Sequence, residues 1–184
     1  PSVTATANYK ELLKNKNIQV VAIATPVNTH YRLAKDALEA GKQVFIEKPI
    51  TSSVKDAEKL IEIAERKNLF IFVDHIFIYT GAIKRIKEFI SSEGLGDIYY
   101  FDSVRVNLGL FQHDINVIWD LAPHDISIMD YIITEKPVSV VAVGASHAQS
   151  GIEDIAYINV NFKNSLIAHF HLNWLSPVKI RRII

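Results

Sequence analysis

The sequence predicts an α/β fold, with a parallel sheet in its first part and a large, mostly antiparallel open sheet in its second part. Up to about residue 74, short apolar runs alternate with helical patterns. This β-α-β-α-β order is typical of a parallel sheet with right-handed crossover connections. From about residue 98 onward, apolar and polar residues alternate along longer segments, which indicates antiparallel strands with one buried face. We therefore expect two domains, residues 1–77 and residues 78–184.

The composition argues against several classes of protein. Lys plus Arg and Asp plus Glu both number 20 among the 184 residues, so no excess of basic residues suggests a nucleic-acid partner. No apolar run approaches the roughly 20 residues that span a bilayer, which argues against a membrane protein. The absence of Cys excludes disulfides and fits a reducing compartment such as the cytoplasm. Because the chain starts without Met and ends within an apolar and basic run, we expect it to be part of a longer protein.

The first part should contain helices and buried strands in alternation. Gly41 follows one helical pattern and is expected to end it, and the spacing of Ser53 and Asp56 resembles a capping box before the next helix. The inner face of that next helix is expected to comprise Val54, Ala57, Leu60, Ile61 and Ala64. In chain order, we expect a helix at Asn8–Lys16, a strand at Ile18–Thr25, a helix capped by Asn28 or Thr29 that runs to about Ala40, a strand at Val44–Ile46, the helix after Ser53, and a strand at Leu69–Val73.

The second part should begin with a helix at Thr80–Ile90, and one later helix, at about Trp119–Ile133, interrupts its strands. Two segments near the end show the strand period most clearly, because alternate residues in each of them are apolar. The expected buried face comprises Ala156, Ile158, Val160, Phe162, Ala168, Phe170, Leu172 and Trp174. The expected opposite face comprises Tyr157, Asn159, Asn161, His169, His171 and Asn173.

The segment Val44–Pro49 joins a buried strand to chemically active residues. Glu47 and Lys48 follow the strand directly, and Pro49 disfavours helical geometry at Lys48. Ligands of open α/β sheets bind just beyond the carboxyl ends of the strands, which makes Lys48 a candidate functional cation. The alternative is that Glu47 and Lys48 form an ordinary surface ion pair worth roughly 0–1 kcal/mol.

A second candidate segment is Trp119–Asp125, near the start of a helix. Because Pro is tolerated in the first helical turn, Pro123 predicts that Asp120 and His124 lie in the opening turn, four residues apart on one face. A carboxylate beside an imidazole can orient the ring and support its charged form, which suits a general acid/base. The simpler alternative, an Asp that caps the helix and a His that only packs, is commoner.

The loop from Thr25 to His30 connects a strand to a helix at the same kind of edge. Its backbone amides and its polar side chains could hold the ribose or phosphate of a cofactor. The alternative is an ordinary helix cap, which is the commoner use of such residues. The loop therefore becomes a cofactor candidate only in combination with other segments.

Further polar residues are candidates in the second part. Arg105 and Asn107 end a strand and could bind substrate oxygens, and His113 in the substrate loop that we expect at residues 108–118 could reach a substrate. His169 and His171 share one strand face and could be a metal pair, but no third ligand is evident. We therefore expect no metal site and interpret these two histidines as part of a polar interface.

With these segments in place, the chain resembles the glucose–fructose oxidoreductase / inositol dehydrogenase / MocA (Gfo/Idh/MocA) family. The matching segments are Ala24–Pro26 with His30, Ala40–Lys42 followed by Val44–Pro49, and Asp120–Asp125. They occur in the family's order, and the resemblance covers essentially the whole chain. It implies an NAD(P)-dependent oxidoreductase of sugars, polyols or nucleotide sugars. Residues 1–77 would be the C-terminal part of a Rossmann domain, and residues 78–184 a domain for substrate binding, catalysis and oligomerisation.

The resemblance also implies roles for individual residues. Lys48 corresponds to the lysine that contacts the reacting hydroxyl, His124 to the proton acceptor, and Asp120 to its acidic partner and substrate contact. This fits the chemistry, because oxidation of an alcohol needs a hydride acceptor, a base, and a cation that stabilises charge on the oxygen. The Lys–Pro bond is often cis in the family, so a cis bond is expected here. The residues that correspond to contacts with an NAD or NADP cofactor are Thr25, Pro26, Asn28, His30, Glu47 and Lys48.

The chain departs from the family in one respect, because it contains no G-x-G-x-x-G segment. We therefore expect the pyrophosphate site, and the residues that choose between NAD and NADP, to lie outside this chain. The Trp119–Asp125 version of the helix resembles members that act on nucleotide sugars, such as UDP-N-acetylglucosamine 3-dehydrogenases. An alternative within the same fold is a sensor or regulator that binds a sugar or nucleotide without converting it. In either case we expect the open sheet face with Tyr157 and His169 to form a homodimer or homotetramer.

Overall fold

The computed structural model describes residues 3–92, 96–109 and 111–184. These residues form two compact units, one up to Asp74 and the other from His75 onward. Each unit has its own sheet and its own hydrophobic core. Within the described residues, no helix is long and apolar enough to cross a membrane.

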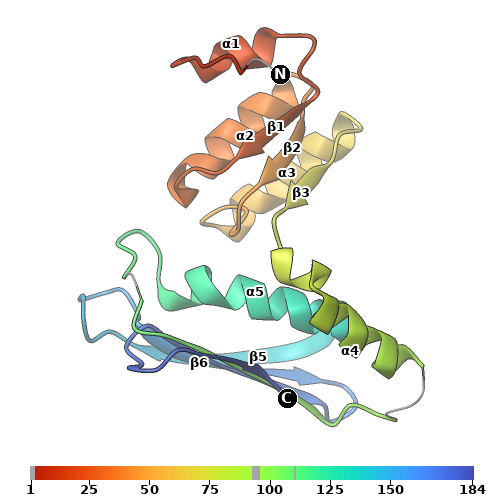
Figure 1. Cartoon of the computed structure of the whole chain (residues 1–184), viewed down its shortest axis with the longest axis vertical. Coiled ribbons are helices and arrows are strands. Elements are labelled where there is room, and N and C mark those ends of the chain that lie inside the picture. Colours follow the sequence, from red (N-terminus) through yellow and green to blue (C-terminus); the bar gives the residue numbers. More distant parts are fainter. Residues whose placement is uncertain (1–2, 93–95, 110) are drawn as a thin grey trace. The chain divides into compact units, whose positions relative to one another are not determined.

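The first unit is a small parallel sheet with two helices packed on it (Figure 1). Its elements are α1 (Tyr9–Lys14), β1 (Val20–Ile23), a 3₁₀ turn (Val27–Thr29), α2 (His30–Glu39), β2 (Gln43–Ile46), α3 (Val54–Arg66) and β3 (Ile71–Val73). The strand order is β1-β2-β3, and both neighbouring pairs are parallel. The predicted β-α-β-α-β order is therefore confirmed.

The core of the first unit forms where the central strand meets both helices. Val44 and Ile46 of β2, Leu38 of α2 and Leu60 of α3 are almost completely buried. Burying one such side chain contributes about 1.5–3 kcal/mol. Gly41 follows α2 with a φ of +76°, a left-handed conformation that glycine adopts readily, so the predicted helix end is confirmed.

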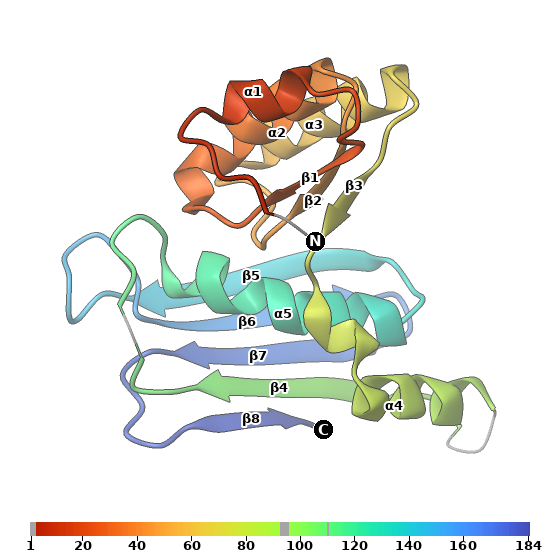
Figure 2. The same ribbon diagram turned by 45° about the horizontal axis from the view of Figure 1, so that its top comes forward.

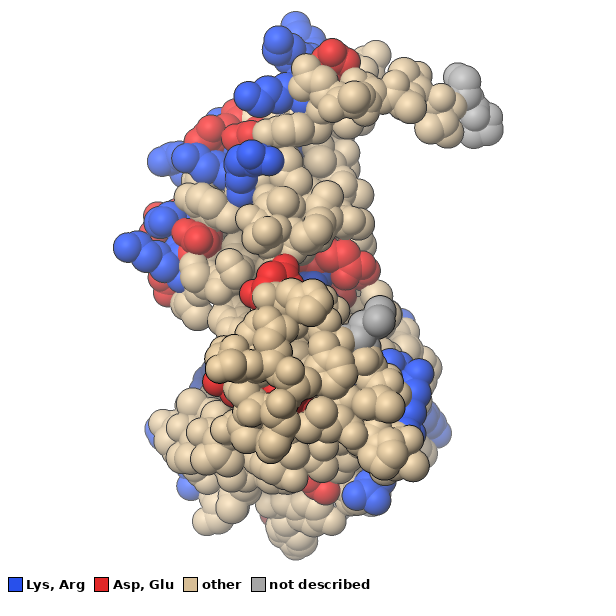
Figure 3. Space-filling view, turned by 90° about the vertical axis from the view of Figure 1, so that its left-hand side faces the viewer, with Lys and Arg blue, Asp and Glu red and all other residues tan. Residues whose placement is uncertain are grey.

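The inner face of α3 differs from the prediction. Ser53 caps the helix as expected, because its hydroxyl accepts a hydrogen bond from the Asp56 backbone N–H (3.2 Å). Val54 and Ile61, however, are 65% and 47% exposed, and Ile63 is buried in their place. At about 100° per residue, Ile61 lies at the margin of the buried stripe rather than within it. On the side of the first unit that Figure 3 shows, the helices carry Lys and Arg interspersed with Asp and Glu.

The second unit is a five-stranded mixed sheet with one long helix across one face (Figure 2). Its elements are a 3₁₀ helix (Ile76–Tyr79), α4 (Gly81–Ser91), β4 (Tyr100–Val106), α5 (Val117–Ile132), β5 (Pro137–Ala145), β6 (Ile155–Phe162), β7 (Ile167–Asn173) and β8 (Ile180–Ile183). The strand order is β5-β6-β7-β4-β8. Among the described strand pairs of this sheet, β4 and β7 alone are parallel, so the predicted mostly antiparallel open sheet is confirmed.

The core of the second unit lies between α5 and the sheet. All eight side chains predicted for the apolar face of β6 and β7 are buried, with exposed fractions of at most 7%. They form one cluster with Val117, Ile128 and Ile132 of α5. The period-2 pattern therefore identified the face that the helix covers.

The start of α5 differs from the prediction. The helix begins at Val117, so Pro123 is its seventh residue and not part of its first turn. The side chain of Asn116 fixes this start, because its Oδ1 accepts from the Trp119 N–H (3.2 Å) and its Nδ2 donates to Glu153 (2.8 Å). Pro123 removes one hydrogen bond within the helix, and the packing of the buried Ala122 and Ile128 in the core offsets that loss.

The opposite face of the second sheet carries aromatic and imidazole rings. Tyr157 stacks on His171 with ring centroids 4.6 Å apart, and on His169 at 6.0 Å. Burial lowers the pKa of His171, and the neighbouring His169 lowers it further. The edge strand β5 is exposed along its length, and Val141 and Val143 on this face are 58% and 61% exposed. An exposed face with this mixture of apolar and aromatic groups is typical of an interaction surface.

Asp154 holds the connection between β5 and β6. Its carboxylate is buried and accepts hydrogen bonds from the backbone N–H groups of His147 (2.7 Å) and Ala148 (2.6 Å). The Nδ1 of His147 lies 2.9 Å from its other oxygen. Burial alone would raise the pKa of Asp154, but these hydrogen bonds outweigh burial and hold the pKa below its ordinary value.

Replacing Asp154 with Ala is expected to lower the free energy of unfolding by about 1.5–3 kcal/mol, because the hydrogen bonds that the buried, charged carboxylate accepts are lost. Since the pKa is lowered on folding, this contribution is complete above the ordinary Asp pKa of about 3.9 and disappears as the pH falls through the folded value. Urea unfolding of both proteins at neutral and acid pH measures the difference. A difference that stays constant at acid pH would contradict the assignment.

Candidate active site

The carboxyl ends of β1 and β2 bring two predicted segments to one edge of the first sheet. Ile23 pairs with Ile46, and the backbone N–H of Glu47 donates to the carbonyl oxygen of Ile23 (3.0 Å). The Thr25–His30 loop and Lys48 therefore leave neighbouring strands at the same edge. This is the edge at which parallel α/β sheets bind ligands.

His30 joins these two segments. Its side chain is buried, with Nε2 2.8 Å from the carbonyl oxygen of Thr25 and Nδ1 2.9 Å from that of Pro49. The Lys48–Pro49 peptide bond is cis, as the family resemblance implied. Each ring nitrogen of His30 thus lies within hydrogen-bonding distance of a main-chain carbonyl oxygen. His30 can therefore hold the Thr25–His30 loop and the Lys48–Pro49 turn in a fixed arrangement.

The predicted capping of α2 was wrong. Neither Asn28 nor Thr29 caps the helix through its side chain, because a 3₁₀ turn leads into it and Thr29 already has a helical backbone. The Thr29 hydroxyl instead donates to the carbonyl of Pro26 (2.7 Å) and lies 2.6 Å from the hydroxyl of Thr25. Thr25, Pro26 and Asn28 are exposed. This loop therefore presents polar groups at the strand edge, as a cofactor contact requires.

Asp120 and His124 lie one turn apart on α5, both half-buried. The indole N–H of Trp174 donates to a carboxylate oxygen of Asp120 (3.2 Å). The ring of Phe77 meets the imidazole of His124 edge to face, with centroids 4.9 Å apart and planes at 89°. Each side chain is thus held by a residue from another element. A carboxylate and an imidazole in this relation can act together in proton transfer.

Arg105 is paired with Asp125, which was not among the predicted site residues. Its Nε and Nη2 donate to the two carboxylate oxygens of Asp125 at 2.8 and 2.6 Å, and both side chains are buried, at 8% and 2% exposed. The guanidinium also lies over the ring of Phe77, 4.7 Å from its centroid. Arg105 therefore connects the sheet to α5 close to His124, and two of its donors face Asp125.

A cavity of about 560 Å³ lies beside Asp120. Asn107 lines it, together with Gln112, Trp174 and Arg181. Trp174 and Arg181 were absent from the predicted site. Trp174 had been interpreted as core alone, and Arg181 belongs to a strand whose position in the sheet is not evident from local sequence.

The remaining candidates lie in or near the loop before α5. His113 is exposed, with Nδ1 3.0 Å from the side-chain oxygen of Gln149. Leu110, in the expected substrate loop, lies outside the described residues. Over the described ranges, no group of three or more His, Cys, Asp or Glu side chains could hold a metal ion.

Comparison with known families defines the class of protein. The family model described as "Oxidoreductase family, NAD-binding Rossmann fold" matches residues 1–75, which makes the first unit part of an NAD-binding Rossmann domain of an oxidoreductase. The model "GFO/IDH/MocA C-terminal domain" matches residues 83–183. The chain belongs to the Gfo/Idh/MocA family of oxidoreductases, as its sequence motifs predicted.

Individual relatives agree with this assignment. A UDP-N-acetylglucosamine 3-dehydrogenase of Acidithiobacillus ferrooxidans is 32% identical over 155 residues, which cover 83% of this chain and 47% of that protein. A solved structure of that name from the same organism, called GnnA, has a TM-score of 0.82 at 28% identity and covers 98% of this chain and 56% of that one.

A more distant solved structure shows the same fold. The crystal structure of an inositol dehydrogenase homologue from Azotobacter vinelandii, complexed with NADH and myo-inositol, has a TM-score of 0.86 at 20% identity, and the match covers 94% of this chain and 49% of that one. At this identity the likeness shows the fold alone. The chain spans about half the length of the curated relatives it matches, or less.

Proposed function

We propose that the protein carrying this chain transfers a hydride between a secondary alcohol of a sugar, polyol or nucleotide sugar and a nicotinamide cofactor. One observation carries the proposal: in a chain of this oxidoreductase family, Asp120 and His124 lie one turn apart on a helix and are held by Trp174 and Phe77. The position of Lys48 and Pro49 directly after β2, at the edge of the Rossmann sheet, supports it.

In this proposal, His124 accepts the hydroxyl proton of the substrate, and Asp120 orients His124 and holds a neighbouring substrate hydroxyl. From its motif, we assign to the Lys48 ammonium the stabilisation of the negative charge that develops on the reacting oxygen as the proton leaves. Nicotinamide, when bound, supplies the hydride acceptor. Trp174 and Phe77 limit the movement of Asp120 and His124, which keeps the proton acceptor oriented.

The chain's own contribution to cofactor binding is the edge formed by β1 and β2. Thr25, Pro26 and Asn28 are exposed there, and Glu47 follows β2 directly, which supports assigning to these residues the contacts with an NAD or NADP molecule. His30 maintains the shape of this edge through its two carbonyl contacts. The edge therefore suits the nicotinamide end of the cofactor.

The substrate class is proposed from similarity. The relative named UDP-N-acetylglucosamine 3-dehydrogenase aligns with 83% of this chain. The Trp119–Asp125 segment belongs to the aligned family domain. We therefore place a nucleotide sugar, oxidised at a ring hydroxyl such as the 3-position, first among the candidate substrates.

A hydride-transfer assay on the protein carrying this chain tests the proposal. Nucleotide sugars, free sugars and polyols are offered with NAD and with NADP, and reduced nicotinamide is followed by absorbance. Turnover of any of them supports the proposal and identifies the substrate class. Cofactor binding without turnover across the whole panel would favour a sugar-binding or nucleotide-binding regulator. Failure to bind cofactor would overturn the oxidoreductase assignment.

We also propose that the open face of the second sheet forms a homodimer or homotetramer. Replacing Tyr157 and His169 with Asp should shift the mass in solution towards the monomer, because each substitution places a charge among the exposed valines of this face. Light scattering of the parent and the double variant measures the mass. An unchanged mass in a folded double variant would contradict the proposed interface.

A further inference from the structure

We propose that Arg181 forms a subsite for an anionic group of the substrate beside Asp120. The group is the carboxylate of a sugar acid or the diphosphate of a nucleotide sugar, which share the chemistry that a guanidinium recognises. This inference rests on the proposed function, since it assigns a class of substrate to the same site.

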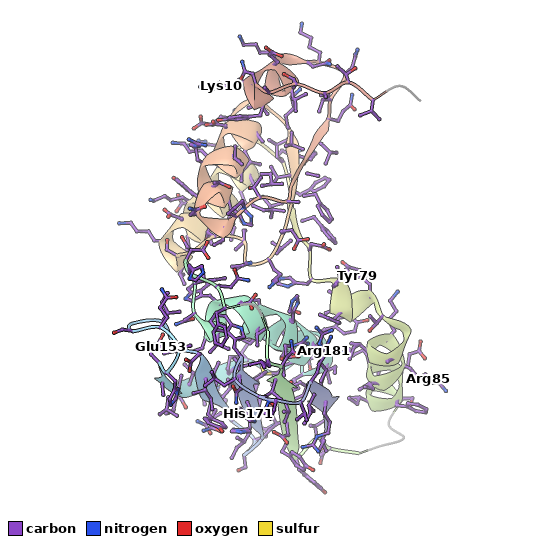
Figure 4. The ribbon with its side chains drawn as sticks, turned by 60° about the vertical axis from the view of Figure 1, so that its left-hand side comes forward. Lys10, Tyr79, Arg85, Glu153, His171 and Arg181 are labelled. Atoms are coloured by element: carbon purple, nitrogen blue, oxygen red, sulfur yellow. The ribbon has the colours of Figure 1, made fainter. Side chains whose placement is uncertain are left out.

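The register of the sheet places Arg181 on the side of α5. Strand β8 is an edge strand of the sheet and runs antiparallel to β4, so that Arg181 lies opposite Arg105. Arg105 faces α5, because it is paired with Asp125 of that helix, so Arg181 faces α5 as well. Figure 4 shows Arg181 beside the helix. Successive side chains of a strand point to opposite faces, so Arg182 belongs to the other face.

Arg105 and Arg181 differ in their ion pairs. Asp125 neutralises Arg105 through two hydrogen bonds. Within the described residues, no carboxylate forms an ion pair with Arg181. The Arg181 guanidinium lies 5.9 Å from the centroid of the Phe77 ring. Arg181 is exposed, so its donors are accessible from solvent. Arg105 thus has a carboxylate partner, whereas the described residues form no ion pair with Arg181, so the positive charge of Arg181 remains available for a ligand.

The surrounding groups suit a polar, charged substrate. The cavity of about 560 Å³ is lined by Arg181, by the side-chain amides of Asn107 and Gln112, and by Asp120. Its volume lies within the usual range of small-molecule sites. Asp120 can accept hydrogen bonds from sugar hydroxyls, while Arg181 can bind an anion with two parallel hydrogen bonds.

The subsite also lies close to the candidate proton acceptor. Phe77 contacts the ring of His124 edge to face and has the guanidinium of Arg181 over its own ring. A substrate held by Arg181 would thus be anchored one aromatic ring away from His124. A neutral polyol would leave Arg181 without a partner, so the site should discriminate in favour of anionic substrates.

Isothermal titration of the full chain with glucuronate, uridine diphosphate and glucose at millimolar concentrations tests the inference. Arg181→Gln is expected to weaken binding of at least one anionic probe about tenfold or more, since a charge-assisted contact is lost, and to leave glucose unchanged. Arg182→Gln is the matched control, because it removes the same charge from the next residue on the opposite face. Glucuronate and uridine diphosphate distinguish a carboxylate from a diphosphate as the recognised group.

Equal weakening by Arg181→Gln and Arg182→Gln, or no binding of either anion, would overturn the inference. Arg181→Lys guards against misfolding, because it keeps the charge and should retain part of the anion binding. The outcome is separable from that of the proposed function. If anion binding depends on Arg181 but no hydride transfer occurs, the subsite is supported and the enzyme proposal is rejected. If neutral polyols are turned over and Arg181→Gln does not affect that turnover, the enzyme proposal is supported and the subsite is rejected.

Discussion

Replacing His124 with Asn is expected to lower kcat for hydride transfer by about a hundredfold to ten-thousandfold, the range that a positioned general base contributes. Asn approximates the size and hydrogen-bonding capacity of the imidazole, but it cannot accept the hydroxyl proton. Cofactor and substrate contacts made by other residues remain, so KM should change little. Steady-state kinetics with the substrate found in the panel measure both constants.

The control for this variant lies on the same helix. Asp130 is exposed near the carboxyl end of α5, and Asp130→Asn should leave kcat within about twofold, since surface substitutions of this kind usually cost less than 0.5 kcal/mol. Circular dichroism of both variants establishes that the helix is intact. If His124→Asn retained most of the activity, His124 would only pack against Phe77, and the proton acceptor would have to be another residue.

The sequence predicted those parts of the fold that a residue's immediate neighbours determine. Alternation along β6 and β7 correctly separated Phe170 and Leu172 from His169 and His171, because a period of two follows directly from strand geometry. The cap at Ser53 was also predicted correctly, since a cap depends on a few consecutive residues.

The wrong predictions concern features of the fold that residues distant along the chain determine. Pro123 was expected in a first turn, yet Asn116, held by Glu153 from another loop, starts the helix earlier. Propensity is a weak preference that tertiary packing overrides.

The candidate site shows the same division. Lys48, Asp120 and His124 were proposed as site residues from their motifs. The contacts of Asp120 with Trp174 and of His124 with Phe77 were not predicted, because these partners are distant along the chain. Arg105 was predicted as a substrate contact, and its sequence neighbours do not reveal that Asp125 of α5 also pairs with it. Recognising a buried ion pair requires the register of the strands and the rotation of the helix together.

Replacing Asp125 with Ala is expected to lower the free energy of unfolding by about 3–5 kcal/mol, the cost of removing one partner of a buried ion pair. Arg105 would keep its charge in a site that is 7% exposed, without the two acceptors that now satisfy Nε and Nη2. Urea unfolding of parent and variant, followed by circular dichroism, measures the loss. Asp130→Ala on the same helix is the matched control and should change stability by less than about 0.5 kcal/mol, because that carboxylate is exposed.

The double variant Arg105→Met/Asp125→Leu separates the two possible origins of this loss. If the cost comes from the unpaired charge, replacing both partners with apolar residues of similar length should recover most of it, because buried ion pairs often exchange for apolar contacts at little cost. If the double variant is as unstable as Asp125→Ala, the hydrogen-bonded geometry itself holds β4 to α5. The same proteins report on function, since the Arg105 guanidinium lies over Phe77, which contacts His124. A stable double variant with lowered kcat would identify the Arg105–Asp125 pair as a positioning element for the proton acceptor.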